Sequence, residues 1–260
     1  MPLQDKVALV TGGSNGIGRG AVRRLLGAGA RVVVADIDEA AGHRLTAEIG
    51  GDFVRCDVRD PDQVGAAVQH VVDSFGGLDV AFLNAGVSTG CGMGDGFDVA
   101  AYRRAIAVNV DGVVFGVVAA LPAMRARGGG DIVVTASLAG LTGTEQDPIY
   151  SAGKHAVVGL VRSLGPVYAR ENIRVNALCP GYAETALLRD IRPLIEQSGV
   201  PILPVDDVVD ALFAVLDSGD AGQCWYVQPG RPSEPFRFRN IPGPRATNVS
   251  STSRRPPSAI

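Results

Sequence analysis

Tyr150 and Lys154 stand four residues apart in a stretch whose pattern predicts a helix. Side chains at that spacing share one helix face, so a phenol and an ammonium group can act on one small region of space. A free phenol has a pKa near ~10, too high for proton transfer at neutral pH. An adjacent ammonium favours the phenolate, so the pair predicts a tyrosine with a lowered pKa that serves as an acid or base. The same spacing also occurs on ordinary helices, and the chemistry therefore depends on what the rest of the chain builds around it.

A glycine-rich turn, residues 11–18 (TGGSNGIG), lies between a predicted strand at 6–10 and a predicted helix at 17–26. Its glycines allow the backbone to approach a pyrophosphate, which is held at the helix N-terminus by free N–H groups and the helix dipole. A bare loop is the alternative, but the flanking strand and helix favour a dinucleotide site. The residues assigned to the dinucleotide are Gly12, Ser14, Asn15, Gly16, Ile17 and Gly18.

Asp36 follows the second predicted strand, 31–35, and is itself followed by Ile37. A carboxylate at this place accepts hydrogen bonds from both ribose hydroxyls of the dinucleotide and repels a 2′-phosphate. The turn at 12–18 contains no Arg or Lys that would attract that phosphate. We therefore expect NAD as the cofactor, with Asp36 and Ile37 beside its ribose. Asp36 could instead only cap the next helix, a role compatible with the first.

Short apolar runs alternate with helical patterns along the chain, which predicts βαβ units and a parallel sheet. The expected strands lie at 6–10, 31–35, 52–56, 78–83, 131–136, 173–178 and 223–228, and the two longest helices at 98–125 and 148–169. One domain is expected over residues 1–228. Residues 229–260 are rich in Pro and Arg and are expected to form an extension without regular structure.

The bulk properties narrow the functional classes. The chain has 260 residues and a formal net charge of −3, which gives no electrostatic case for nucleic acid or an anionic membrane surface. The longest uncharged apolar run, 112–124, is too short to span a bilayer, and the first strand leaves no room for a signal peptide. Four separated cysteines and three scattered histidines predict neither a disulfide framework nor a metal site. We expect a cytoplasmic protein.

Two helical segments, 113–120 and 156–161, are apolar nearly all round. A helix that lies on a sheet needs only one apolar stripe, so the surplus predicts a homodimer or homotetramer formed through helices 98–125 and 148–169. The alternative is that a loop or the C-terminal extension covers this surface. Phe236 and Phe238 of the extension could pack over the active site or onto a neighbouring subunit.

Further motifs complete a known pattern: Asp57, Asn84-Ala85-Gly86, Asn109, Ser137 and Pro180-Gly181. With the glycine turn and the Tyr-Lys pair, their order and spacing are similar to those of the short-chain dehydrogenase/reductase family, from residue 5 to about 228. The resemblance implies an α/β fold, a Rossmann-type doubly wound parallel sheet of seven strands with helices on both faces. It implies hydride transfer between NAD(H) and a secondary alcohol or ketone.

Four residues match the catalytic positions of that family. Tyr150 matches the acid/base, and Lys154 matches the lysine that also holds the ribose of the nicotinamide. Ser137 matches the serine that hydrogen-bonds the substrate oxygen, although a serine there could also only cap a turn. Asn109 matches the asparagine whose backbone carbonyl holds a water in a proton relay to Lys154.

The resemblance also assigns the remaining contacts with the cofactor and the substrate. Asp57 and Val58 would flank the adenine, and the Asn84-Ala85-Gly86 motif would support the central strand and let the ribose approach. The carboxamide of the nicotinamide would meet the segment after the sixth strand, at Pro180, Gly181, Ala183 and Thr185. The family more often has a β-branched residue at the place of Ala183. The expected substrate contacts are mostly apolar and favour a hydrophobic small molecule: Ser137, Leu138, Thr144, Tyr150, Tyr182 and Leu187.

Two other functions share parts of this pattern. A regulator that binds NAD without turnover needs the dinucleotide site but not the full set of catalytic residues. Sugar epimerases and dehydratases share the Tyr-Lys pair, but they have another glycine spacing and a larger C-terminal substrate domain than this chain offers.

Overall fold

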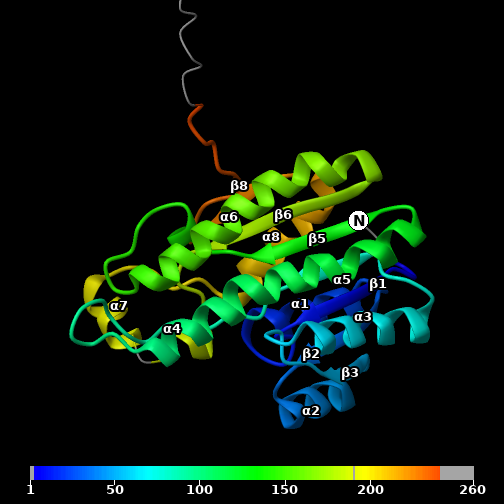
Figure 1. The fold of residues 1–260 in the computed structure, drawn as a ribbon, viewed down its shortest axis with the longest axis horizontal. Helices are drawn as coiled ribbons and strands as arrows, with labels where there is room; N and C mark the ends of the chain where they lie inside the picture. The colour runs from blue at the N-terminus through cyan, green and yellow to red at the C-terminus, as the bar shows by residue number, and fades with distance from the viewer. Residues whose placement is uncertain (1–2, 190, 241–260) are drawn as a thin grey trace, which may run out of the picture.

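The computed structural model describes residues 3–189 and 191–240, which form one sheet with helices on both faces (Figure 1). The order in the sheet is β3-β2-β1-β4-β5-β6-β7-β8. The first seven strands are parallel, and β8 is antiparallel to β7. The strands are β1 (Val7–Thr11), β2 (Arg31–Asp36), β3 (Asp52–Arg55), β4 (Val80–Leu83), β5 (Gly130–Thr135), β6 (Ile173–Pro180), β7 (Cys224–Val227) and β8 (Glu234–Pro235).

Eight α-helices connect or follow these strands: α1 (Gly16–Gly27), α2 (Glu39–Ile49), α3 (Pro61–Phe75), α4 (Val99–Ile106), α5 (Gly112–Arg127), α6 (Pro148–Tyr168), α7 (Arg192–Ser198) and α8 (Val205–Ser218). One layer consists of α3, α5 and α6, and α1, α2 and α8 cover the opposite face (Figure 1). The strands β1, β2, β4, β5 and β6 are almost entirely buried, as expected for a parallel sheet between two helical layers. The Rossmann-type architecture predicted from the sequence is confirmed.

The order of the strands places the candidate site. β1 lies between β2 and β4, so the chain leaves β1 toward one side of the sheet and later returns on the other. A crevice opens at such a switch point, outside the carboxyl ends of the strands. Because β1 to β7 are parallel, the segments that follow β1, β2, β3, β4, β5 and β6 all meet at this edge. The predicted site residues stand in these segments.

The structure differs from the sequence-based prediction in the extension after residue 228. Glu234–Pro235 form an eighth strand on the edge of the sheet, where irregular structure was expected. Phe238 packs against the core of its own chain, with the guanidinium of Arg162 of α6 3.8 Å from the centre of its ring. The extension therefore covers part of α6. Residues 241–260 lie outside the described part of the chain.

The predicted helix at 98–125 is also more complex than expected. It is one continuous helical stretch from Val99 to Arg127, but a π-helical segment (Ala107–Asp111) separates α4 from α5. By length and composition this stretch would be able to cross a membrane. Its inward face, with Val113, Val117 and Ala120, is buried against the sheet, so it serves as a core helix of the fold.

Candidate active site

The glycine turn has the shape and the free polar groups that a dinucleotide phosphate needs. Gly12 has a φ of 61°, and a Cβ on Gly18 would lie 2.1 Å from the carbonyl oxygen of Gly12. The helices α2, α3, α4 and α6 each begin with an aspartate that caps their N–H groups, whereas the side chain of Asn15 leaves the N-terminus of α1 uncapped. The Ser14 hydroxyl is buried here and has no partner among the described residues. These groups fit a bound pyrophosphate.

Asp36 is buried at the end of β2 and is fixed toward this turn. One carboxylate oxygen accepts a hydrogen bond from the backbone N–H of Ser14 at 2.9 Å, and the other accepts from the backbone N–H of Asp38 at 3.0 Å. Each oxygen keeps a lone pair for a further donor. Ile37, the next residue, leaves its side chain half-exposed beside the turn. Both residues stand where a dinucleotide ribose was predicted.

Asp57 forms an ion pair with Arg59, which was not predicted from the sequence. Both carboxylate oxygens accept hydrogen bonds from the Arg59 guanidinium, and this pairing lowers the pKa of Asp57. The Val58 side chain is buried against Gly112 of α5, where a Cβ would lie 2.9 Å from a Val58 methyl group. An adenine that approaches this segment would meet the Asp57–Arg59 pair and not a free carboxylate.

Asn84 joins the glycine turn to two strands of the sheet. Its side-chain amide donates to the carbonyls of Thr11 and Gly12, and its Oδ1 accepts from the Thr135 hydroxyl at 3.0 Å. Ala85 lies directly against the turn, since a Cβ on Gly12 would come within 2.8 Å of its Cα. The predicted support of the central strand by this motif has its physical basis in these contacts.

Asn109 lies in the π-helical segment and is buried. Its side chain satisfies both backbone polar groups of Val87, accepting from the N–H at 2.9 Å and donating to the carbonyl at 2.8 Å. A Cβ on Gly86 would lie 3.3 Å from Asn109 Oδ1 and 3.6 Å from Lys154 Nζ. The structure therefore brings Gly86, Asn109 and Lys154 together. Single-turn π segments of this kind often occur at functional sites.

Lys154 points into the carboxyl edge of the sheet, where its ammonium donates to the carbonyl of Thr135 at 2.7 Å. It is 3% exposed, and this burial lowers its pKa to about 8. Its Nζ lies 5.5 Å from the centre of the Tyr150 ring. The two side chains share a face of α6, as the spacing predicted.

The pKa of Tyr150 corrects one expectation. Burial raises it to about 12; a hydrogen bond with Ser137 acts in the opposite direction, and the negative charge of Asp147 adds to the rise. The neighbouring ammonium was expected to lower this pKa, but Lys154 is directed to the Thr135 carbonyl and desolvation of the phenolate dominates. In the protein alone, Tyr150 is a proton donor.

Ser137 lies two residues after the end of β5 and caps a short 3₁₀ turn (Leu138–Gly140), so the capping role considered for it is real. Its hydroxyl accepts from the backbone N–H of Ala139 at 3.1 Å and donates to the carbonyl of Pro180 at 3.4 Å. The contact with Tyr150 nevertheless keeps it in the site. On the far side of the crevice, Thr185 lies against the glycine turn, since a Cβ on Gly16 would be 2.9 Å from its methyl group.

The segment after β6 leaves the sheet and returns to it. Tyr182 and Glu184 exchange backbone hydrogen bonds with Leu203, and Ala183 pairs with Leu203 in an isolated bridge. Between these points the chain forms a 3₁₀ turn (Ala186–Leu188) and α7. Gly181 lies against Leu138, and Tyr182 is half-buried. Leu187 is exposed, so no contact of its side chain with the crevice is established.

Two residues that hold the site were missed from the sequence. The carbonyl of Thr135 receives the Lys154 ammonium, and no motif reports a backbone group. Asp147 begins α6 and accepts a hydrogen bond from the backbone N–H of Tyr150 at 2.9 Å. The signal was available, because Asp147-Pro148 repeats the pattern of Asp60-Pro61 at the start of α3. Thr144, predicted to contact substrate, donates its hydroxyl to the Asp147 carbonyl.

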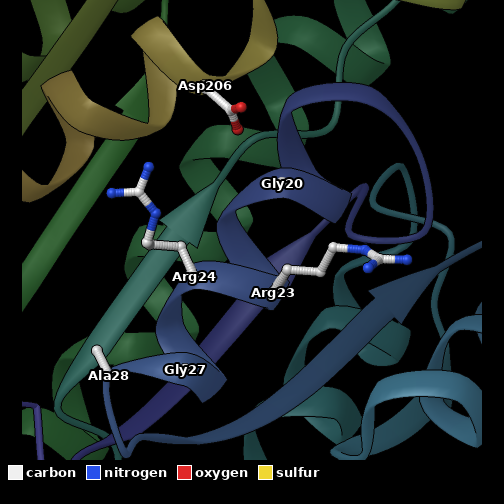
Figure 2. A pocket seen from close by; sticks show the side chains of 6 residues that line it. All are labelled: Gly20, Arg23, Arg24, Gly27, Ala28 and Asp206. Atoms are coloured by element: carbon white, nitrogen blue, oxygen red, sulfur yellow. The ribbon is translucent and has the colours of Figure 1, made fainter.

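Two cavities lie elsewhere in the described structure. One, of about 390 Å³, is lined by α1 and α8 (Figure 2), and its Arg23 and Arg24 are paired with Glu48 and Asp210. The other, of about 220 Å³, lies at the amino ends of the strands, where Lys6 and Arg127 pair with Asp79 and Arg174 pairs with Asp131. The arginines and lysine of both cavities are thus held in ion pairs, and neither cavity is part of the candidate site.

Replacing Lys154 by methionine is expected to raise the free energy of unfolding at about pH 7 by about 1–2 kcal/mol, because the buried ammonium is removed and the aliphatic stem is kept. Because the pKa of Lys154 is lowered from 10.5 to about 8 by folding, the unfolded chain binds this proton more readily than the folded protein between pH 8 and pH 10.5. The stability of the wild type therefore rises with pH in that window. Urea denaturation measures the difference in free energy of unfolding between the variant and the wild type. This difference should be smaller at about pH 9.5 than at about pH 7. A variant less stable than the wild type at pH 7 would contradict this account of the site.

Comparison with known proteins agrees with this geometry. The family model described as short chain dehydrogenase matches residues 6–195. The chain is 35% identical to a cyclohexanol dehydrogenase of Acinetobacter sp. (strain SE19), over 84% of this chain and 89% of that protein. It is 40% identical to a 2,5-dichloro-2,5-cyclohexadiene-1,4-diol dehydrogenase of Sphingobium indicum, over 72% of this chain and 76% of that one.

A solved structure is also similar over nearly its whole length. The 3-ketoacyl-(acyl-carrier-protein) reductase from Brucella melitensis, complexed with NADH, is 30% identical, with a TM-score of 0.80 over 88% of this chain and 99% of that one. These likenesses support a nicotinamide cofactor and an oxidoreductase that acts on alcohol groups, and they set aside the reading as a non-catalytic regulator. The chain belongs to the short-chain dehydrogenase/reductase family.

Proposed function

We propose that this enzyme oxidises a secondary alcohol to a ketone with NAD, or runs the reverse reduction. The observation that carries the proposal is the convergence at one edge of the sheet: Lys154 is buried beside Gly86 and Asn109, and shares a helix face with Tyr150. Tyr150 in turn contacts Ser137 in the segment that follows β5. A phenol, a hydroxyl and a buried ammonium are the groups that proton transfer to or from an alcohol oxygen requires.

In this mechanism Ser137 donates a hydrogen bond to the substrate oxygen, and Tyr150 takes the proton of the alcohol. A bound nicotinamide, when oxidised, supplies the acceptor for the hydride of the carbinol carbon and a positive charge that favours the phenolate. Lys154 binds the ribose hydroxyls with the ammonium donors that the Thr135 carbonyl leaves free. The side chain of Asn109 positions its π-helical segment, and the backbone carbonyl of Asn109 would hold the relay water.

The proposed substrate is a cyclic, mostly apolar secondary alcohol or its ketone. The two relatives described above are, by their names, dehydrogenases of six-membered ring alcohols. The segments that follow β4 and β6 expose apolar side chains, among them Met93, Phe97, Leu187, Ile191 and Leu194. Such a surface favours a hydrophobic substrate over a sugar phosphate.

We also propose a cytoplasmic location, supported by the four free thiols.

Replacing Tyr150 by phenylalanine is expected to lower kcat about a thousandfold for cyclohexanol with NAD, because the group that exchanges the proton is lost. NADH binding should stay within about twofold, since the phenol acts on the substrate. Absorbance of NADH measures turnover, and quenching of protein fluorescence measures binding. Wild-type rates in the variant would show that Tyr150 is not the acid/base.

The preference for NAD is assigned to Asp36, whose carboxylate is fixed beside the Ser14 amide. Replacing it by alanine removes the acceptor for the ribose hydroxyls and the repulsion of a 2′-phosphate. The ratio of kcat/KM for NAD to that for NADP should fall at least about tenfold. An unchanged ratio would remove Asp36 from cofactor selection.

We further infer a homodimer or homotetramer formed through the outer faces of α4, α5 and α6. Among the described residues, five large apolar side chains are exposed on these helices: Val99 and Tyr102 of α4, Val114 and Val118 of α5, and Val167 of α6. Val118 is 63% exposed, although the chain's own extension covers part of α6. Light scattering should give twice or four times the monomer mass, and Val118→Glu should lower it. A monomeric wild type would contradict the proposal.

A further inference from the structure

Asp147 bonds at once to the first turn of α6, the helix that carries Tyr150 and Lys154, and to a loop that precedes it by 58 residues. One carboxylate oxygen accepts the backbone N–H of Tyr150 at 2.9 Å, as a helix cap does. The other accepts the backbone N–H of Thr89 at 2.8 Å. The backbone carbonyl of Asp147 accepts two further hydrogen bonds, from the Thr144 hydroxyl and from the backbone N–H of Ser151. The residue is therefore fixed at four points.

The other aspartate caps do not reach across the structure in this way. The Asp98 carboxylate accepts from the N–H groups of Ala100 and Ala101 of α4. Asp60 accepts from Asp62 and Gln63 of α3, and Asp38 accepts from Ala41 of α2. In each of these the hydrogen bonds to the carboxylate come from residues of the capped helix. Asp147 thus does more than start α6.

The loop that Asp147 holds follows β4 and forms one wall of the crevice. Three hydrogen-bonded residues hold its first part. Asn84 bonds to the glycine turn, Val87 bonds to the Asn109 side chain, and Thr89 bonds to the Asp147 carboxylate. Thr89 is 1% exposed, and its hydroxyl is buried without a partner among the described residues. From Gly90 to Phe97 nearly all residues are exposed. Asp147 is therefore the last polar anchor before the free part of the loop.

We propose that Asp147 is a positioning residue that ties the loop after β4 to the catalytic helix, and so sets the affinity for the alcohol or ketone. The inference rests on the proposed function, since the affinity in question is that of the substrate of Tyr150. The hydrogen bond to Thr89 involves an ionised acceptor and is stronger than a neutral one. Its loss would free the wall that confines the substrate while the cofactor turn on the far side stays intact.

A second consequence separates this role from simple capping. Asp147 is one of the groups that face Tyr150, together with Ser137, Lys154 and Cys179, and its negative charge raises the pKa of the phenol after the larger effect of burial. Removing that charge favours the phenolate. In the direction of alcohol oxidation, the acidic limb of the pH profile of kcat must then move to lower pH.

The test uses Asp147→Asn, which has one acceptor oxygen in place of two and so cannot accept from the N–H groups of Tyr150 and Thr89 at once. The KM for cyclohexanol should rise about tenfold with a smaller change in kcat, and the acidic limb should shift to lower pH. NADH binding should change less than about twofold. An unchanged KM together with an unchanged pH profile would overturn the proposal.

The matched control is Asp98→Asn, which weakens the cap of α4 at the other end of the same loop, because the Asp98 carboxylate accepts only from N–H groups of α4 among the described residues. It should leave KM and the pH profile as in the wild type. If it changes both as Asp147→Asn does, the effect is general loosening of the loop and the assignment to Asp147 fails.

Hydrogen–deuterium exchange separates this proposal from the proposed function, because it needs no turnover. The amides at residues 87–91 should exchange faster in Asp147→Asn than in the wild type, with those of α1 unchanged. Equal exchange would show that Asp147 does not hold the loop after β4, even in an active enzyme. Faster exchange in a protein that oxidises no alcohol would support the role of Asp147 in holding the loop and would reject the proposed function.

Discussion

Burying the ammonium of Lys154 costs free energy, because a charge leaves water, and the pKa of about 8 reflects that cost. The carbonyl of Thr135 offsets part of it at 2.7 Å, and Gly86 keeps the space open, since a Cβ there would lie 3.6 Å from Nζ. The end of β5 and the segment that follows β4 are therefore held around one charge carried by α6. A protein selected only for stability would place an apolar side chain here, which indicates that the charge serves a function.

The glycine turn depends on the same part of the sheet. Asn84 bonds to the carbonyls of Thr11 and Gly12 on one side and to the Thr135 hydroxyl on the other, so the turn and the Lys154 acceptor are joined through one side chain. Asn109 then fixes Val87, the next part of the same segment. The switch point between β1 and β4 thus positions the dinucleotide turn and the proton-transfer groups as one unit, which suits a reaction in which a hydride and a proton leave neighbouring atoms.

What the sequence could predict was whatever is local or periodic. The buried strands, the glycine turn and the Tyr150–Lys154 face follow from short-range patterns. The rest needed contacts across the fold. The π segment accompanies the meeting of Asn109 with Val87, the Asp57–Arg59 pair depends on local side-chain geometry, and the strand at Glu234–Pro235 forms only because β7 offers an edge. The direction of the Tyr150 pKa depends on burial, which no spacing reports.

The central claim is that the carbinol carbon of a secondary alcohol gives its hydride directly to the nicotinamide while Tyr150 takes the hydroxyl proton. Cyclohexanol deuterated at the carbinol carbon tests it, with NAD and the enzyme in ordinary water and the reduced dinucleotide analysed by NMR. The account predicts one deuterium per reduced dinucleotide, on one face of ring carbon C4, and cyclohexanone as the other product. Reduced dinucleotide without deuterium, or no reduced dinucleotide from any member of a panel of cyclic secondary alcohols, would contradict it.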